Sequence, residues 1–282
     1  MDSKEETVGV MEALLLGVEK ADEDDRLVEK RYWGKATGIN WCERDYEHSE
    51  YIAEFWNTIT NVGFIIVGVY GLFLVNKLKL PRRFTALSYC LIGLGLTSGF
   101  FHASLLWTGQ KLDESFENVL LVILYHSDSM DQRIASLHSI IVTLGIFLIT
   151  AFLFCEIHLI VIAILTLTKV RREAALAQLQ VGEKLRLGLS RSIKIAGVSI
   201  VIGAICWLFD RLFCGVIRAS PFNPQLHSWW HIFCAISLHQ ALVLAIAMYQ
   251  FREKLEGKKT DDFDSILPLV VVNRFGLGDV KY

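Results

Sequence analysis

The sequence predicts an all-α fold, a polytopic membrane protein with seven transmembrane helices. Of its 282 residues, 53% are hydrophobic and 21% are charged, so the chain carries less charge than a typical soluble domain. Residues 56–76, 86–107 and 229–249 contain no Asp, Glu, Lys or Arg. Each segment is as long as the ~20-residue apolar helix that is needed to cross a bilayer. This composition excludes a cytosolic globular enzyme, a disordered chain and a small disulfide scaffold.

Four weaker segments complete the seven spans. Residues 137–154 and 157–168 are predicted as two spans, because one helix covering both would be much longer than the ~30 Å hydrocarbon core. Residues 195–209, extended back to 191, form another. Residues 113–130 are the weakest candidate, since acidic side chains surround their apolar centre. All should be helical, because a lone spanning segment must satisfy its own backbone groups in lipid.

The distribution of charge predicts the orientation. With seven spans, the Lys and Arg residues of 77–83, 169–194 and the tail after residue 251 fall on one side. Residues 1–54 fall on the other, with 15 acidic side chains against 7 basic ones. The positive-inside rule then makes the C-terminus cytoplasmic and the N-terminus lumenal. The net charge of −2 argues against a nucleic-acid partner.

Three histidines are predicted to meet at the lumenal face. His227 and His231 open the last span and lie four residues apart, on one face of a helix. His102 lies near the end of the second span, which reaches the same face. Three histidine ligands with a fourth position left for water are typical of a catalytic zinc site. The sequence therefore predicts a metal site inside the helical bundle.

Two polar residues accompany the histidines at this face. Asp113 begins the third span, and Ser98 lies one turn before His102. A carboxylate beside activated water can accept its proton, and a serine hydroxyl can donate to a developing oxyanion. The spacing alone is equally compatible with Asp113 serving only as a helix cap.

An acidic segment precedes the first span. The oxygen-bearing side chains of Asn40, Glu43, Asp45 and Glu54 have the chemistry that calcium prefers, but their spacing does not match an EF-hand. By spacing alone, a solvated acidic loop is the stronger interpretation. Cys42 and Cys214 both fall just outside the membrane on the lumenal side, where an oxidising compartment would favour a disulfide.

At these residues the chain resembles the alkaline ceramidases, in order and spacing from about residue 32 to residue 240. The first block is the most specific, whereas the Ser, Asp and His set is shared with a wider superfamily that includes the progestin/adiponectin-type receptors. The matching segments are Tyr32-Trp33-Gly34, Ile39-Asn40-Trp41-Cys42-Glu43, Tyr51-Ile52-Ala53-Glu54-Phe55-Trp56-Asn57-Thr58, Ser98, Phe101-His102, Leu112-Asp113-Glu114, Asp210, Phe213-Cys214 and His227 with Trp229-Trp230-His231-Ile232.

The resemblance implies a membrane enzyme that hydrolyses the amide of ceramide to a sphingoid base and a free fatty acid, in the endoplasmic reticulum or Golgi. Zinc would be bound by His102, His227 and His231, with Asp113 exchanging protons with the zinc-activated water and Ser98 supporting the oxyanion. It also implies a Cys42–Cys214 disulfide. Calcium would be bound through Asn40, the Trp41 carbonyl, Glu43, Asp45 and Glu54. The family usually has Asp at position 40 and Asn at position 45, so the exchange leaves the charge unchanged.

Four regions follow from this interpretation. Residues 1–31 form a flexible extension, 32–55 the calcium-binding loop, 56–250 the seven-helix catalytic domain and 251–282 a cytoplasmic tail. The segment 103–117 departs from the family pattern, which bears on substrate preference. Two alternatives remain: a seven-span receptor of the progestin/adiponectin type, and a related hydrolase acting on another membrane lipid.

Overall fold

The computed structural model describes residues 32–126, 183–220 and 222–255, with scattered helical residues between 137 and 172. In these residues all regular structure is helical, which confirms the all-α prediction. The helices are α2 (Phe55–Thr60), α3 (Val62–Leu78), α4 (Arg82–Ser104), α5 (Trp107–Tyr125), α8 (Glu183–Ala219) and α9 (Leu226–Leu255).

Four of the described helices are long and apolar enough to cross a membrane. They are Phe55–Leu78, which joins α2 to α3, Arg82–Ser104, Arg186–Ala219 and Leu226–Glu253. They match the first, second, sixth and seventh predicted spans. The third prediction, 113–130, differs in its start, since α5 begins at Trp107 and carries polar residues that shorten its apolar run. The predicted spans at 137–154 and 157–168 lie largely outside the described residues.

The outer surfaces of these helices are apolar. On α3 the side chain of Ile66 is 62% exposed, and on α8 that of Val198 is 58% exposed. Surfaces of this kind suit contact with lipid or with further apolar helices, because bilayer tails need no hydrogen bonds. The chain is therefore a membrane protein.

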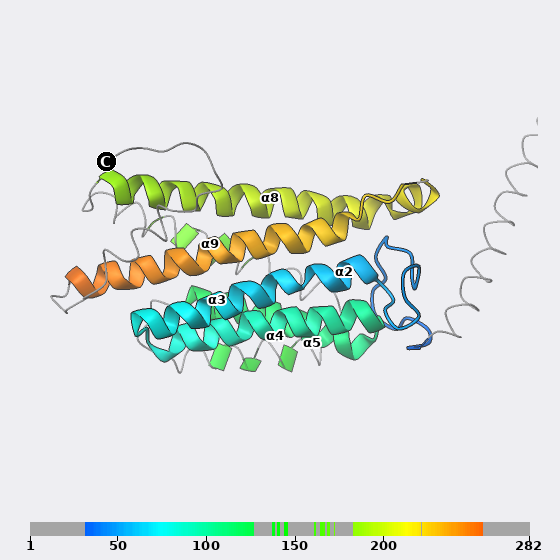
Figure 1. Cartoon of the computed structure of the whole chain (residues 1–282), viewed down its shortest axis with the longest axis horizontal. Coiled ribbons are helices and arrows are strands. Elements are labelled where there is room, and N and C mark those ends of the chain that lie inside the picture. Colours follow the sequence, from blue (N-terminus) through cyan, green and yellow to red (C-terminus); the bar gives the residue numbers. More distant parts are fainter. Residues whose placement is uncertain are drawn as a thin grey trace, which may run out of the picture.

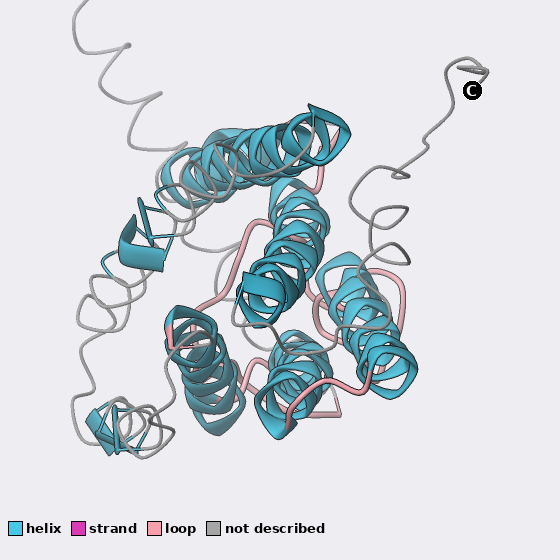
Figure 2. Cartoon of the chain, turned by 90° about the vertical axis from the view of Figure 1, so that its left-hand side faces the viewer, coloured by secondary structure: helices cyan, strands magenta, loops and turns pink. Residues whose placement is uncertain are grey.

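The helices run side by side, as Figures 1 and 2 show from two directions. α8 packs against α9, and α4 packs between α3 and α5. Small residues allow close approach: a Cβ added at Gly95 of α4 would lie 2.9 Å from the Asn61 carbonyl oxygen. Buried leucines such as Leu74, Leu91 and Leu242 fill the space between α3, α4 and α9.

The N-terminal loop, residues 32–54, lies over one end of this bundle (Figure 1). The N–H groups of Thr37 and Gly38 donate to the Leu105 carbonyl, and the N–H of Glu54 donates to the His102 carbonyl. The loop is thereby fastened to the turn between α4 and α5. At the same end α9 begins and α8 finishes, which brings four chain segments together around one site.

We expect Gly95→Ala to destabilise the protein, because its methyl group would press on the Asn61 carbonyl across the α3–α4 contact. Overpacking of this kind costs about 1–3 kcal/mol, measurable as a lower melting temperature in detergent. Gly197→Ala is the control, since an added Cβ there meets nothing within 4 Å among the described residues. Equal melting temperatures for the two variants would contradict the close packing at Gly95.

Candidate metal centre

Three histidines converge at the end of the bundle that the loop covers. His102 lies in the last turn of α4, and His227 and His231 lie in the first turns of α9. One ring nitrogen of each lies within 4.8 Å of the others, and all three side chains are buried. The structure thus brings together the three residues that the sequence predicted as metal ligands. A metal ion fits a group of three imidazole nitrogens at this spacing.

Two of the rings are held by hydrogen bonds at Nδ1. His102 Nδ1 lies 2.6 Å from Glu54 Oε2, and His231 Nδ1 lies 3.0 Å from the hydroxyl of Thr60. Both contacts leave Nε2 available as a ligand atom, in the orientation that partners of metal-binding histidines usually impose. His227 Nδ1 is buried, with no hydrogen-bond partner in the described part of the chain. A buried imidazole nitrogen in that state is suited to binding a metal ion.

The side chain of Trp41 is part of the site, and the sequence did not predict this. Its ring stacks on His227 with centroids 3.8 Å apart, and its backbone N–H donates to Glu54 Oε1 at 2.8 Å. The prediction assigned only its carbonyl, to calcium. The ring contact depends on how the loop folds over α9, and nothing in the spacing of the sequence signals it.

A cavity opens beside the histidines. Its lining includes all three of them, Trp41 of the loop and Asp113 of α5. Asp113 therefore faces the same space as the candidate metal ligands, as its predicted role requires. Ser98 is buried one turn before His102 but is not among the residues that line the cavity.

The two glutamates of the loop are buried and bind backbone groups. Glu43 accepts hydrogen bonds from the N–H groups of Trp56 and Asn57, at 2.7 and 2.9 Å, and so caps the start of the first spanning helix. Glu54 accepts from Trp41 and from the side-chain amide of Asn57. Burial raises the pKa of each carboxyl to about 7. The hydrogen bonds oppose this rise but do not cancel it.

The predicted calcium ligands are neighbours, but their carboxylates do not converge on one point. Within the described residues, the group of acidic, His and Cys side chains close enough to share a metal ion is the three-histidine group. The Asn40 side chain instead donates to Asp45 Oδ2 at 2.7 Å. Carboxylate, amide and backbone carbonyl oxygens are ligand types that calcium prefers, so the donor set is chemically compatible with that ion.

Arg218 is the second residue that sequence reasoning missed. It lies in the last turn of α8 and donates to the Trp41 carbonyl at 2.6 Å. The sequence did contain a signal for it: Arg218 lies one helical turn after Cys214, on the side of the membrane that is predicted to be poor in Lys and Arg.

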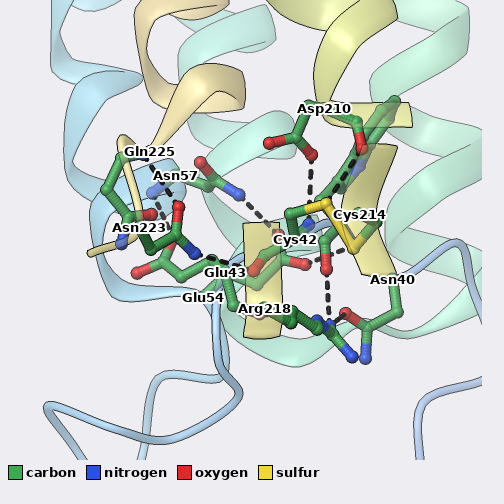
Figure 3. Close-up of a disulfide and its surroundings, with 11 residues drawn as sticks. Asn40, Cys42, Glu43, Glu54, Asn57, Asp210, Cys214, Arg218, Asn223 and Gln225 are labelled. Atoms are coloured by element: carbon green, nitrogen blue, oxygen red, sulfur yellow. Dashed lines mark hydrogen bonds between the residues drawn. A yellow bond between two sulfur atoms is a disulfide. The ribbon is translucent and has the colours of Figure 1, made fainter. Parts of the chain in front are cut away.

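A disulfide between Cys42 and Cys214 joins the loop to α8 (Figure 3). This confirms the predicted pairing. Further contacts surround it: the Cys42 N–H donates to Asp210 Oδ2 at 3.0 Å, and the side-chain amide of Asn223 donates to the Cys42 carbonyl at 2.8 Å. The loop is therefore fixed to α8 by a covalent bond as well as by hydrogen bonds.

We expect Glu54→Gln to weaken metal binding at the three histidines. Both carboxylate oxygens accept hydrogen bonds, and an amide nitrogen in place of one would face a donor. Losing such a partner of a metal-binding histidine typically costs about 10–100-fold in metal affinity, measurable as metal per chain after competition with a chelator. Glu50→Gln, at an exposed position of the same loop, is the control. Equal metal content in both variants would contradict the role of Glu54.

Comparison with known proteins agrees with the pattern of the sequence. The family model described as Ceramidase matches residues 35–271. The chain is 27% identical to an alkaline ceramidase of Arabidopsis thaliana over 253 residues, covering 86% of this chain and 96% of that protein. It is 30% identical to alkaline ceramidase 1 of Mus musculus over 241 residues, covering 78% and 84%. An alkaline ceramidase of Drosophila melanogaster is 29% identical over 271 residues. The chain belongs to the ceramidase family.

Proposed function

We propose that this protein hydrolyses the amide bond of ceramide and releases a sphingoid base and a free fatty acid. The observation that carries the proposal is the buried group of three histidines, with Asp113 facing the same cavity. Family membership supports the substrate, since the relatives are named alkaline ceramidases. The alternative of a receptor has no comparable support, because the relatives named above are all ceramidases.

The metal is proposed to be zinc. Three neutral imidazoles with space beside them are the ligand set of many catalytic zinc sites. A zinc ion held by His102, His227 and His231 would polarise the amide carbonyl and lower the pKa of water towards ~7. Glu54 and Thr60 keep the rings of His102 and His231 in the orientation needed for this binding.

The remaining chemistry is assigned to side chains of α4 and α5. The Asp113 carboxylate accepts a proton from the attacking water and passes it to the leaving amine of the sphingoid base. The Ser98 hydroxyl is proposed to support the oxyanion of the carbonyl under attack. Water adds to the carbonyl carbon, the C–N bond breaks, and the fatty acid and the amine leave as separate products.

The arrangement in the membrane is proposed to have seven spans, with residues 56–250 as the catalytic bundle. The loop of residues 32–55 would face the lumen of the endoplasmic reticulum or Golgi, and residues 251–282 would be cytoplasmic. The Cys42–Cys214 disulfide supports this orientation, because disulfides persist in oxidising compartments. A cavity within a helical bundle also suits a lipid substrate that arrives from the bilayer.

Calcium is proposed as the second ion, bound by the loop through Asn40, the Trp41 carbonyl, Glu43, Asp45 and Glu54. Support comes from the two buried glutamates, whose carboxyl pKa is raised to about 7 by burial. A divalent cation beside them would offset that desolvation. Residues 1–31 are proposed as an extension outside both sites.

The direct test is to incubate detergent-purified protein with short-chain and long-chain ceramides at alkaline pH and to quantify the released sphingoid base. We expect release from ceramide that stops after metal removal and returns with zinc. A glycerophospholipid is the comparison substrate. Protein that holds zinc but releases no sphingoid base from any ceramide would contradict the proposal, and fatty acid released from the phospholipid would point to the alternative hydrolase.

Two substitutions separate metal binding from proton transfer. We expect His231→Ala to lose metal and activity together. Asp113→Asn should retain the metal but lose about 10²–10⁴-fold in turnover, the usual contribution of a general acid–base group. His239→Ala, two turns deeper in α9, is the matched control and should keep both. Full turnover in Asp113→Asn would remove Asp113 from the mechanism.

A further inference from the structure

One nitrogen of the Arg218 guanidinium stands among three oxygens of the loop (Figure 3). It donates to the Trp41 carbonyl at 2.6 Å, to the Asn40 side-chain oxygen at 3.0 Å and to the Glu43 carbonyl at 3.2 Å. Three uncharged oxygens gathered around one positive charge resemble part of the oxygen shell that a hard cation requires.

Two of these oxygens belong to the set proposed for calcium. A calcium ion bound by the Asn40 side-chain oxygen and the Trp41 carbonyl would lie close to the guanidinium nitrogen that donates to both, and the two positive charges would repel each other. Binding of the ion therefore requires the guanidinium to leave.

Arg218 also supplies positive charge where the loop needs it. Its charge acts on buried Glu54 and partly opposes the rise of that carboxyl's pKa. Arg44, in the loop, donates to the Arg218 carbonyl at 3.3 Å. The loop and the end of α8 thus hold each other through contacts in both directions. The same arrangement places Trp41 on His227 and Glu54 on His102.

We propose that Arg218 is a built-in cation that holds the N-terminal loop on α8 and that calcium binds by displacing it. The proposal rests on the calcium site of the proposed function and adds its regulation. The measured calcium affinity then reflects the free energy of binding the ion minus the free energy of the Arg218 contacts that are lost.

The test compares Arg218→Met with the wild type and with Arg211→Met, a control at an exposed arginine two turns earlier in α8. Methionine keeps an unbranched side chain but offers neither charge nor a calcium ligand. Calcium affinity is measured by titration calorimetry on zinc-loaded protein in calcium-free buffer. We expect Arg218→Met to bind calcium on the order of tenfold more tightly than the wild type. The variant has no Arg218 contacts to break when the ion binds, and a factor of this size corresponds to about one charge-assisted hydrogen bond.

Thermal stability provides the second measurement. Without calcium, Arg218→Met should melt at a lower temperature than the wild type, and calcium should raise its melting temperature by more. Arg211→Met should behave as the wild type in both measurements. Arg218→Lys keeps the charge but not the planar guanidinium, so its calcium affinity and melting temperature should lie between those of the wild type and Arg218→Met. It replaces the methionine variant in the test if that variant does not fold.

The outcomes distinguish this proposal from the proposed function. Calcium affinity that is unchanged or weaker in Arg218→Met would overturn the displacement of Arg218 while leaving a calcium site in place. Calcium binding only in the variant would show that Arg218 blocks the site and is not displaced, and would overturn the proposal for the wild type. No calcium binding in either protein would overturn it together with the calcium part of the proposed function. Release of sphingoid base by the same preparations reports separately on the hydrolase.

Discussion

The carboxylate of Glu54 is the group on which the site depends. It is fully buried and joins three segments: the backbone of the loop at Trp41, the first spanning helix at Asn57 and the histidine of α4 at His102. Burying a charge is costly unless it is paired and hydrogen-bonded. Each of these contacts offsets part of that cost, so the position of the loop and the orientation of His102 are determined together.

The loop is held in place by bonds of different kinds at its two sides. Its start is hydrogen-bonded to the α4–α5 turn, and its centre is joined to α8 by the Cys42–Cys214 disulfide and by Arg218. The covalent bond limits how far the loop can move, while the Arg218 contacts can exchange for other partners. A segment without regular secondary structure thereby becomes a firm wall of the cavity.

The α5 helix explains why a polar segment belongs in an apolar bundle. Its buried face carries a Lys111–Glu114 ion pair at 2.6 Å, and Gln110 donates to the same carboxylate at 2.6 Å. The side chain of Gln110 also accepts the N–H of Ile39, at 3.0 Å. These groups satisfy one another inside the bundle, beside the cavity that Asp113 lines. The polar residues that made α5 the weakest predicted span therefore lie next to the candidate site.

The sequence by itself determined the helical class, the three charge-free spans and the candidate ligands. An uncharged run such as 229–249 forms a helix in a bilayer, because only a helix satisfies the backbone groups of a lone segment there. The spacing of His227 and His231 then places both on one helical face. The pairing of Cys42 with Cys214 was indicated by their shared side of the membrane and by the family resemblance. These conclusions depend only on helical spacing and on which side of the membrane each connecting segment lies.

Tertiary structure decided which groups actually touch. The same Glu54 that was assigned to a calcium loop also contacts His102, Trp41 stacks on His227, and Arg218 takes oxygens predicted for an ion. These contacts join residues 48 to 186 positions apart in the chain. Their formation depends on how an irregular loop closes over helix ends. No periodic pattern encodes that closure, because it is set by the combined demands of buried charge, hydrogen bonding and a covalent link.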